Sequence, residues 1–372
     1  MLSFLHDIPL VGSAYAWFLV LLAAASYVSF YTYVVPFFIQ AFLLNEQNLK
    51  NKYDAKWAVV TGASSGIGRA LTEKLASQGV SVVMVALDDQ LLESFHADMC
   101  SQYADVADVE FRKVGVNLGS SGYLQVIAEA TEDIPVQLVF NNAGFVITGL
   151  YADVPLPAQL ANFECNAAAP IHITHLFVNR MLNQGLRGAV CFTSSPAGLM
   201  PAPLTVMYSA TKSFLTTFAA SLAPEIKPDG IDVLVVHPSP VDTRFYEGNT
   251  HDLDAMRAFQ KTAYPPTTIA ACFFKSLGRF VIHDQGYFSL SLRMLMKTVD
   301  YNFLALVFSR TASISGDYTK TKKDRPLPDD NSGGLVTPRR SRSVSAVSAA
   351  DSVSRSVSRS VSRSVSVANR RR

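Results

Sequence analysis

The sequence has few cysteines, and their spacing fits neither a disulfide framework nor a metal site. The four cysteines lie far apart in the chain: Cys100, Cys165, Cys191 and Cys272. Zinc sites use closely spaced ligand pairs, and small secreted scaffolds are much richer in cysteine. We therefore expect free thiols in a reducing compartment, no bound metal, and Cys165 and Cys191 as small core residues.

Charged residues are also sparse, at 17% of the 372 residues, and the net charge is only +2. Basic residues gather near the C-terminal end, so the rest of the chain is close to neutral. A folded nucleic-acid-binding surface needs a basic patch, and this distribution argues against nucleic acid as a partner. His172, His175 and His237 lack ligand spacing, and we expect them to make local hydrogen bonds.

Charge is absent altogether from Ile8 to Leu44. This apolar run exceeds the roughly 20 residues that a helix needs to cross a bilayer. It lacks the basic start and short apolar core of a cleavable signal peptide, so a permanent membrane anchor is predicted. Pro36 is expected to interrupt the helix, with residues near 10–35 spanning and the following apolar segment lying along the interface. A tight hairpin is the alternative.

The charges that flank the apolar run predict its orientation. Lys50, Lys52 and Lys56 follow it, whereas His6 and Asp7 are the only titratable side chains before it. The positive-inside rule therefore places the rest of the chain in the cytosol, in agreement with reduced cysteines.

Short apolar runs alternate with segments of helical spacing from residue 57 onward. Trp57–Thr61 suits a strand buried on both faces, and a helix from Arg69 to Gln78 leads to a second strand, Val80–Ala86. Further candidate strands occupy residues 109–116, 136–141, 188–194 and 231–237. The predicted fold class is α/β, a Rossmann-type doubly wound parallel sheet with helices on both faces.

Three glycines occur where the first strand turns into the first helix. A diphosphate fits there, because free backbone N–H groups and the helix dipole both favour anionic oxygens. Gly62 permits the turn, Gly66 allows close backbone approach, and Gly68 lets the helix pack tightly on the sheet. An ordinary turn is the competing interpretation, but the position inside a βαβ unit favours nucleotide binding.

A tyrosine and a lysine begin the apolar helical stretch that runs to about Ile226. Tyr208 and Lys212 are four residues apart, so they project from the same helix face. A cation held near the phenol is expected to lower its pKa toward the working range, which makes tyrosine a usable acid or base. Thirteen residues upstream, Ser195 follows a candidate strand, and its hydroxyl can stabilise a developing alkoxide.

Together these motifs resemble the short-chain dehydrogenase/reductase family over roughly residues 55–280. Thr61–Gly68 resembles the cofactor turn, Asn141–Gly144 the motif after the fourth strand, and the serine, tyrosine and lysine match the catalytic set. The family's usual spacing selects Ser195 as the catalytic serine and leaves Ser194 as a candidate helper.

The resemblance implies that a hydride moves between a nicotinamide and a carbonyl carbon while Tyr208 transfers the proton. It implies that Lys212 grips the ribose, that Asn141 supports the sheet, and that Asn166 is a fourth catalytic residue holding a relay water; a local hydrogen-bonding role for Asn166 is the competing interpretation. The cofactor-binding residues implied are Thr61, Gly62, Ser64, Ser65, Gly66, Ile67, Gly68, Asn117, Asn142, Ala143, Gly144, Tyr208, Lys212, Pro238, Val241 and Thr243.

A finer resemblance is to the membrane-bound branch that contains 17β-hydroxysteroid dehydrogenases and very-long-chain 3-oxoacyl-CoA reductases. The anchor, Pro201-Ala202-Pro203 and Tyr-Asn-Phe-Leu-Ala near residue 301 carry it. It implies reduction of a lipid-like ketone, first a 3-oxoacyl-CoA, with a hydroxysteroid or keto-sphingoid base as alternatives. It further implies the endoplasmic reticulum membrane and a homodimer. A non-catalytic nucleotide-sensing membrane scaffold is the alternative from another class.

Two departures from the family bear on the cofactor. Pro238-Ser239-Pro240 stands where the family often has Pro-Gly, which predicts a stiffer loop over the nicotinamide. After the second strand, Asp88 and Asp89 come without an arginine for a 2′-phosphate, and Asp88 lies two places later than the usual NAD-selecting aspartate. The membrane-bound reductases favour NADP(H) over NAD(H), whereas Asp88 argues against it because a carboxylate repels a phosphate.

The remaining segments complete the predicted organisation. Phe245 to Pro266 is expected to form a lid over the substrate, with a plain surface helix as the alternative. Residues 286–308 alternate apolar clusters with charges, which suits a helix on the bilayer surface or packed on the domain. The polar Arg/Ser-rich C-terminal end buries too little apolar surface to offset the entropy that it would lose on ordering, so it is expected to be disordered. The predicted parts are an anchor (1–50), a catalytic domain (51–285), an amphipathic or membrane-associated helix (286–317) and a disordered tail (318–372).

Overall fold

The computed structural model describes residues 9–106, 108–246 and 253–323. Within them lies a seven-stranded sheet of order β3-β2-β1-β4-β5-β6-β7 whose strand pairs are all parallel. The predicted α/β doubly wound fold is confirmed. The strands are β1 (Trp57–Thr61), β2 (Ser81–Ala86), β3 (Phe111–Gly115), β4 (Val136–Asn141), β5 (Gly188–Thr193), β6 (Ile231–Pro238) and β7 (Ile282–Gln285).

The strand order creates a crevice between β1 and β4. The chain builds outward from β1 to β3, then returns to place β4 on the other side of β1. The connections that leave β1 and β4 therefore diverge to opposite faces of the sheet. Ligands of open α/β sheets bind at the carboxyl ends of the strands at this switch point.

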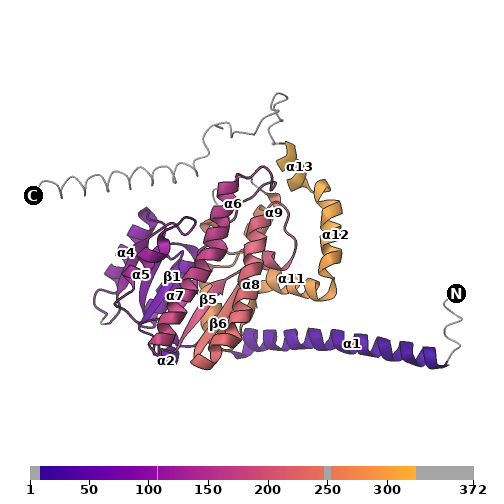
Figure 1. The fold of residues 1–372 in the computed structure, drawn as a ribbon, viewed down its shortest axis with the longest axis horizontal. Coiled ribbons are helices and arrows are strands. Elements are labelled where there is room, and N and C mark those ends of the chain that lie inside the picture. Colours follow the sequence, from indigo (N-terminus) through magenta and orange to yellow (C-terminus); the bar gives the residue numbers. More distant parts are fainter. Residues whose placement is uncertain (1–8, 107, 247–252, 324–372) are drawn as a thin grey trace, which may run out of the picture. The chain divides into compact units, whose positions relative to one another are not determined.

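Helices cover both faces of the sheet, and α7 and α8 cross it in the foreground of Figure 1. Leu75, Phe95 and Phe273 pack in the core of one face, and Phe177 and Leu215 in that of the other. Full burial of such side chains contributes about 1.5–3 kcal/mol each. One face carries α3 (Gly66–Ser77), α4 (Gln90–Gln102) and α10 (Pro266–Ser276), and the other α5 (Tyr123–Ala130), α7 (Ala169–Asn183) and α8 (Val206–Ile226).

The N-terminal apolar run forms α1 (Pro9–Phe38), a π-helical segment (Ile39–Leu43) and, after a short break, α2 (Leu49–Tyr53). Pro36 lies inside α1, so the break expected there does not occur. Large apolar side chains of α1 such as Trp17 and Leu21 are exposed, at 67% and 66%. The helix is long and apolar enough to cross a membrane, which is compatible with an anchor.

The C-terminal third departs from the sequence expectations. The single helix expected over 286–308 is two helices, α11 (Gly286–Thr298) and α12 (Tyr301–Thr311), because Asp300 caps the second one by accepting from Phe303 N at 3.0 Å. α13 (Gly316–Lys323) is helical, so the first residues of the expected tail are ordered. Residues 324–372, with the Arg/Ser repeat, and 247–252 of the expected lid lie outside the described residues.

Shorter helices complete the described chain. Part of the expected lid is present as a 3₁₀ turn and α9, on either side of the undescribed residues. These elements are α6 (Leu156–Phe163), a π-helical turn (Glu164–Ala168), α9 (Asp254–Gln260) and 3₁₀ turns at Pro196–Leu199, Lys227–Asp229, Arg244–Tyr246 and Ala312–Ile314.

Candidate active site

The glycine turn forms a cradle at the start of α3. Gly62 and Gly66 have φ of +64° and +54°, which side chains other than glycine rarely adopt. A Cβ on Gly68 would lie 2.1 Å from Gly62 O, so only glycine allows this packing. Ser65 is the N-cap, but its side chain does not bond the N–H groups of the first turn. These residues fit a diphosphate, because the free N–H groups favour anionic oxygens.

Thr61 and Asn142 tie together the carboxyl ends of three strands. Thr61 Oγ1 accepts from the backbone N–H groups of Asn142 and Ala143, both at 2.9 Å. Asn142 Nδ2 donates to Thr61 O at 3.1 Å, and Thr193 Oγ1 donates to Asn142 Oδ1 at 3.0 Å. These bonds hold the ends of β1, β4 and β5 together at the crevice. Thr61 therefore supports the glycine turn without lining the cavity.

Two buried asparagines brace the neighbouring loop and helix. Asn166 Nδ2 donates to Phe145 O at 2.9 Å, and Asn166 Oδ1 accepts from Phe145 N at 3.1 Å. The side chain of Asn166 is therefore committed to the loop after β4, which supports the local hydrogen-bonding interpretation for that side chain. Asn141 Nδ2 donates to Thr174 Oγ1 on α7 at 3.1 Å, in keeping with its implied support of the sheet.

The expected serine, tyrosine and lysine converge at the end of β5. Ser195 and Tyr208 line the same cavity. Lys212 Nζ lies 5.7 Å from the centroid of the Tyr208 ring and donates to Thr193 O at 2.8 Å. The spacing of four residues on α8 thus delivers both side chains to one place, as predicted.

The electrostatics differ from the sequence expectation. Burial raises the pKa of Tyr208, and the nearby side chain of Ser195 only partly opposes this shift. The net shift is upward, so the expected lowering of the tyrosine pKa toward the working range is wrong. Burial lowers the pKa of Lys212 to about 8, because the interior disfavours its charge.

The neighbouring serines have different surroundings. Ser195 lines the cavity beside Tyr208. Ser194 is buried and donates to Lys212 O on α8 at 2.7 Å, with Thr216 Oγ1 at 3.0 Å. The structure therefore assigns the cavity position to Ser195, and Ser194 holds α8 against β5.

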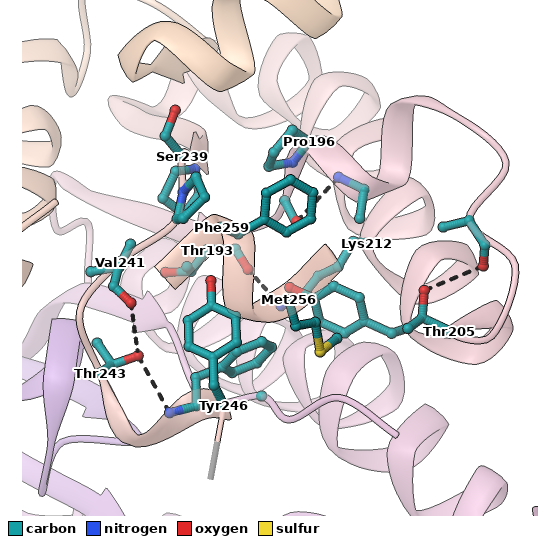
Figure 2. Close-up of a pocket in the computed structure, with 18 of the residues that line it drawn as sticks. Thr193, Pro196, Thr205, Lys212, Ser239, Val241, Thr243, Tyr246, Met256 and Phe259 are labelled. Atoms are coloured by element: carbon teal, nitrogen blue, oxygen red, sulfur yellow. Dashed lines mark hydrogen bonds between the residues drawn. The ribbon is translucent and has the colours of Figure 1, made fainter. Parts of the chain in front are cut away.

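A cavity of about 600 Å³ opens in front of these residues, and its wall is mainly apolar. Figure 2 shows Met256 and Phe259 of α9 and Tyr246 among the side chains around Lys212. Sequence reasoning missed most of this wall, because isolated apolar residues on later helices carry no motif. Further lining residues are Phe145, Met200, Phe245, Leu253, Phe288, Leu292 and Phe308.

Most of the predicted cofactor residues reach this cavity. A Cβ on Gly144 would lie 3.2 Å from Lys212 Nζ, so a glycine there keeps the space beside the ammonium open. The residues that line the cavity are Gly62, Ser65, Gly66, Ile67, Asn142, Ala143, Gly144, Ser195, Tyr208, Lys212, Pro238, Val241 and Thr243. The predicted residues outside its lining are Thr61, Ser64, Gly68, Asn117 and Asn166.

Asn117 is engaged in its own turn. Its Oδ1 accepts from Gly119 N at 2.9 Å after β3. Ser239, where the family often has glycine, donates from its backbone N to Gln285 O at 2.9 Å and from Oγ to the same oxygen at 2.7 Å. These bonds tie the end of β6 to β7 and give a physical reason for the expected stiffness of the loop.

The three histidines make hydrogen bonds, but only His175, whose backbone oxygen accepts from Asn179 Nδ2 at 2.9 Å, bonds locally as expected. His237 pairs with Asp284 at 2.6 Å, and His172 with Tyr123 at 3.0 Å. Sequence reasoning missed Asp284 as a partner, because β7 is four residues long and mostly polar. Cys165 and Cys191 are buried free thiols.

Residues 56–254 match the short chain dehydrogenase family. The chain belongs to this family. Relatives include the very-long-chain 3-oxoacyl-CoA reductase of Laccaria bicolor, which is 33% identical over 53% of this chain and 58% of its own length. The human enzyme of that name is 26% identical over 72% of this chain and 84% of its own. The chain thus spans a little over half of the fungal relative.

The fold is shared with solved structures. One, from work on the stereoselectivity of a 7β-hydroxysteroid dehydrogenase, superposes with a TM-score of 0.60 at 24% identity, over 68% of this chain and 96% of that chain. At this identity the likeness shows the fold alone. The fold of this short-chain dehydrogenase binds a nicotinamide cofactor.

Proposed function

We propose that this short-chain dehydrogenase is a nicotinamide-dependent oxidoreductase that reduces the ketone of a lipid-like substrate, most specifically a 3-oxoacyl-CoA. The observation that carries the proposal is the convergence of Ser195, Tyr208 and the buried Lys212 on the wall of one apolar cavity. This arrangement supplies a proton donor, an oxyanion partner and a cation in one place.

Each residue has a distinct role in the proposal. Ser195 donates a hydrogen bond to the carbonyl oxygen, and Tyr208 gives that oxygen its proton. The raised pKa of Tyr208 keeps the phenol protonated before the step. Lys212 stabilises the phenolate that remains. When bound against the glycine turn, the nicotinamide supplies the hydride.

The substrate class follows from the cavity and the anchor. Aromatic and aliphatic side chains dominate the cavity wall, and a long apolar helix precedes the domain. A lipid-like ketone partitions into such a wall, and the names of the relatives favour a 3-oxoacyl-CoA over a steroid or keto-sphingoid base.

The test uses the full chain in detergent with NADPH and all three ketone classes. We expect consumption of NADPH with a 3-oxoacyl-CoA, and its loss in Tyr208→Phe. Absence of turnover with every class would overturn the lipid assignment. Full cellular function of Tyr208→Phe would favour the non-catalytic scaffold instead.

The proposed cofactor is NADP(H), on the resemblance to membrane-bound reductases. Asp88 bears on this choice, because its carboxylate folds over Gly115 at the ends of β2 and β3; a Cβ on Gly115 would lie 2.7 Å from Asp88 Oδ1. A higher kcat/KM with NADH than with NADPH would refute the preference.

The proposed location is the endoplasmic reticulum membrane, with the catalytic domain in the cytosol. The exposed apolar face of α1 and the lysines after it support this. In sealed microsomes we expect added protease to digest the domain, and protection of the domain would refute the orientation. A homodimer through the helices that carry Asn166 and Tyr208 is proposed as well. The exposed Phe163 and Phe214 near them support it, and the mass of the detergent complex measures it.

A further inference from the structure

α12 has apolar side chains on two opposite faces. On its inner face, Phe308 lines the cavity. On its outer face, Phe303, Leu306 and Val307 are exposed, at 58%, 44% and 37%. Their spacing of three and four residues makes this outer face one continuous stripe. An exposed apolar stripe on a helix that also lines a binding cavity marks a site of interaction with an apolar partner.

The preceding helix, α11, connects this region to the membrane helix. Lys297 Nζ of α11 donates to Ser29 O of α1 at 3.0 Å and lies 5.5 Å from the centroid of the Tyr33 ring. Tyr33 Oη donates to Asp284 Oδ2 at 3.0 Å, just before α11 begins. The folded domain therefore contacts α1 near Ser29 and Tyr33.

This level coincides with the edge of a bilayer. A span needs about 20 residues, so a span counted from Tyr15, where the candidate membrane segment begins, ends near Val34. Ser29 and Tyr33, in the last turns before that end, meet the ammonium of Lys297, which suits the headgroup region. Because α12 begins soon after Lys297, its outer face lies at this height, and Figure 1 shows α11 and α12 on the side of the domain toward which α1 extends.

The ends of α12 suit the same surroundings. Tyr301, at its start, is 56% exposed, and tyrosine favours the interface between headgroups and hydrocarbon. Arg310, in the last turn, continues the outer stripe seven residues after Phe303 and brings a cation to the headgroups. The pattern of an apolar stripe with an aromatic and a cation at its ends is that of a helix lying on a bilayer.

We propose that the outer face of α12 rests on the bilayer that α1 enters, and that the acyl tail of the substrate passes from the lipid into the cavity beside Phe308. The second half rests on the proposed function, whereas the docking of α12 does not. Lipid on one side of this helix and the cavity on the other give the tail a route that avoids water.

A quenching experiment tests the docking without any turnover. In full-length protein with Cys100→Ser, a bimane probe is attached at Val307→Cys, or at Val126→Cys on α5 as a control of similar exposure. In vesicles of phosphatidylcholine and phosphatidylserine with brominated lipid, we expect strong quenching at position 307 and none at 126. Equal quenching at the two positions, or a disulfide between two copies of the unlabelled Val307→Cys protein in the vesicles, would overturn the docking.

A kinetic experiment tests the route. The double variant Phe303→Glu with Leu306→Glu should raise KM for a long-chain 3-oxoacyl-CoA supplied in vesicles about tenfold with kcat unchanged, because charge opposes docking. Its kcat/KM for a short, water-soluble 3-oxoacyl-CoA should stay at the wild-type value. Leu91→Glu with Val126→Glu is the matched control, on helices at the other end of the sheet.

The outcomes separate the two proposals. Quenching at position 307 in a protein that turns over no ketone would leave the docking in place and remove the proposed function. Equal KM values for the double variant and its control with the vesicle substrate would overturn the route.

Discussion

Asp284 Oδ1 lies 2.6 Å from His237 Nδ1, and both side chains are buried. Arg293 Nε donates to the other carboxylate oxygen at 2.8 Å, and Thr216 Oγ1 lies 2.8 Å from His237 Nε2. Together with the hydrogen bond from Tyr33, these contacts join α1 to α8, which carries Tyr208 and Lys212. Burial disfavours the carboxylate, but the hydrogen bonds from His237 and Arg293 outweigh it and hold the pKa of Asp284 well below its usual range.

Asp284→Asn should therefore destabilise the protein strongly. It removes the charge that His237 and Arg293 face, and such a loss at a buried pair costs about 3 kcal/mol. Thermal unfolding in detergent measures the effect, with the exposed Asp98→Asn on α4 as the control. Because the pKa is lowered, the contribution of Asp284 is present above about pH 4 and is lost only as pH falls further. Equal melting temperatures for the two variants would contradict this account.

The adjacent serines permit a matched comparison. Ser195→Ala removes a hydroxyl beside Tyr208 and should lower kcat/KM for the ketone by about 10²–10³-fold. Ser194→Ala removes a bond to Lys212 O and should cost about 1 kcal/mol of stability with a much smaller effect on rate. Steady-state kinetics and thermal unfolding of both variants give the two readouts. A larger rate loss in Ser194→Ala would reverse the assignment.

Cofactor preference should respond to Asp88. Asp88→Asn removes a negative charge from the ends of β2 and β3, and a partly screened charge there is worth about 1 kcal/mol against a phosphate. We expect KM for NADPH to fall about fivefold, with KM for NADH unchanged. The control is Asp98→Asn, which removes the same charge further along the chain. An equal change for both cofactors would show that Asp88 does not sense the 2′-phosphate.

The sheet and the convergence of Ser195, Tyr208 and Lys212 could be predicted because their signals are local. Strands buried on both faces appear as apolar runs, so β1 and β4 were predicted with their observed bounds. Tyr208 and Lys212 meet because helical geometry fixes residues four apart on one face.

The cavity wall and the buried ion pair could not be predicted, because they depend on contacts between distant segments. Asp284 meets His237 across 47 positions, and Phe308 reaches the cavity from beyond the catalytic motifs. The pKa of Tyr208 was also mispredicted, since helical spacing brings the lysine near but says nothing of how deeply the cavity encloses the phenol. α1 continues through Pro36 to Phe38, so a single proline inside an apolar run did not mark the end of the helix.

The lysine predicts a pH dependence. Lys212 is charged below its pKa of about 8 and neutral above it, because burial makes its ammonium easier to deprotonate. The ammonium stabilises the phenolate left after Tyr208 gives up its proton, so kcat/KM for ketone reduction should be level below about pH 8 and fall about tenfold per pH unit above it. Initial rates from about pH 6 to pH 9.5 at saturating cofactor measure the limb.

Lys212→Arg identifies the group responsible. A guanidinium stays charged over this range, so the limb near pH 8 should disappear while some activity remains. Thermal unfolding of the variant shows whether the buried arginine is accommodated, since Lys212 is only 3% exposed. A limb that persists unchanged in Lys212→Arg would assign the titration to another group, and a rate that rises through pH 8 would mean that the neutral lysine is the active form.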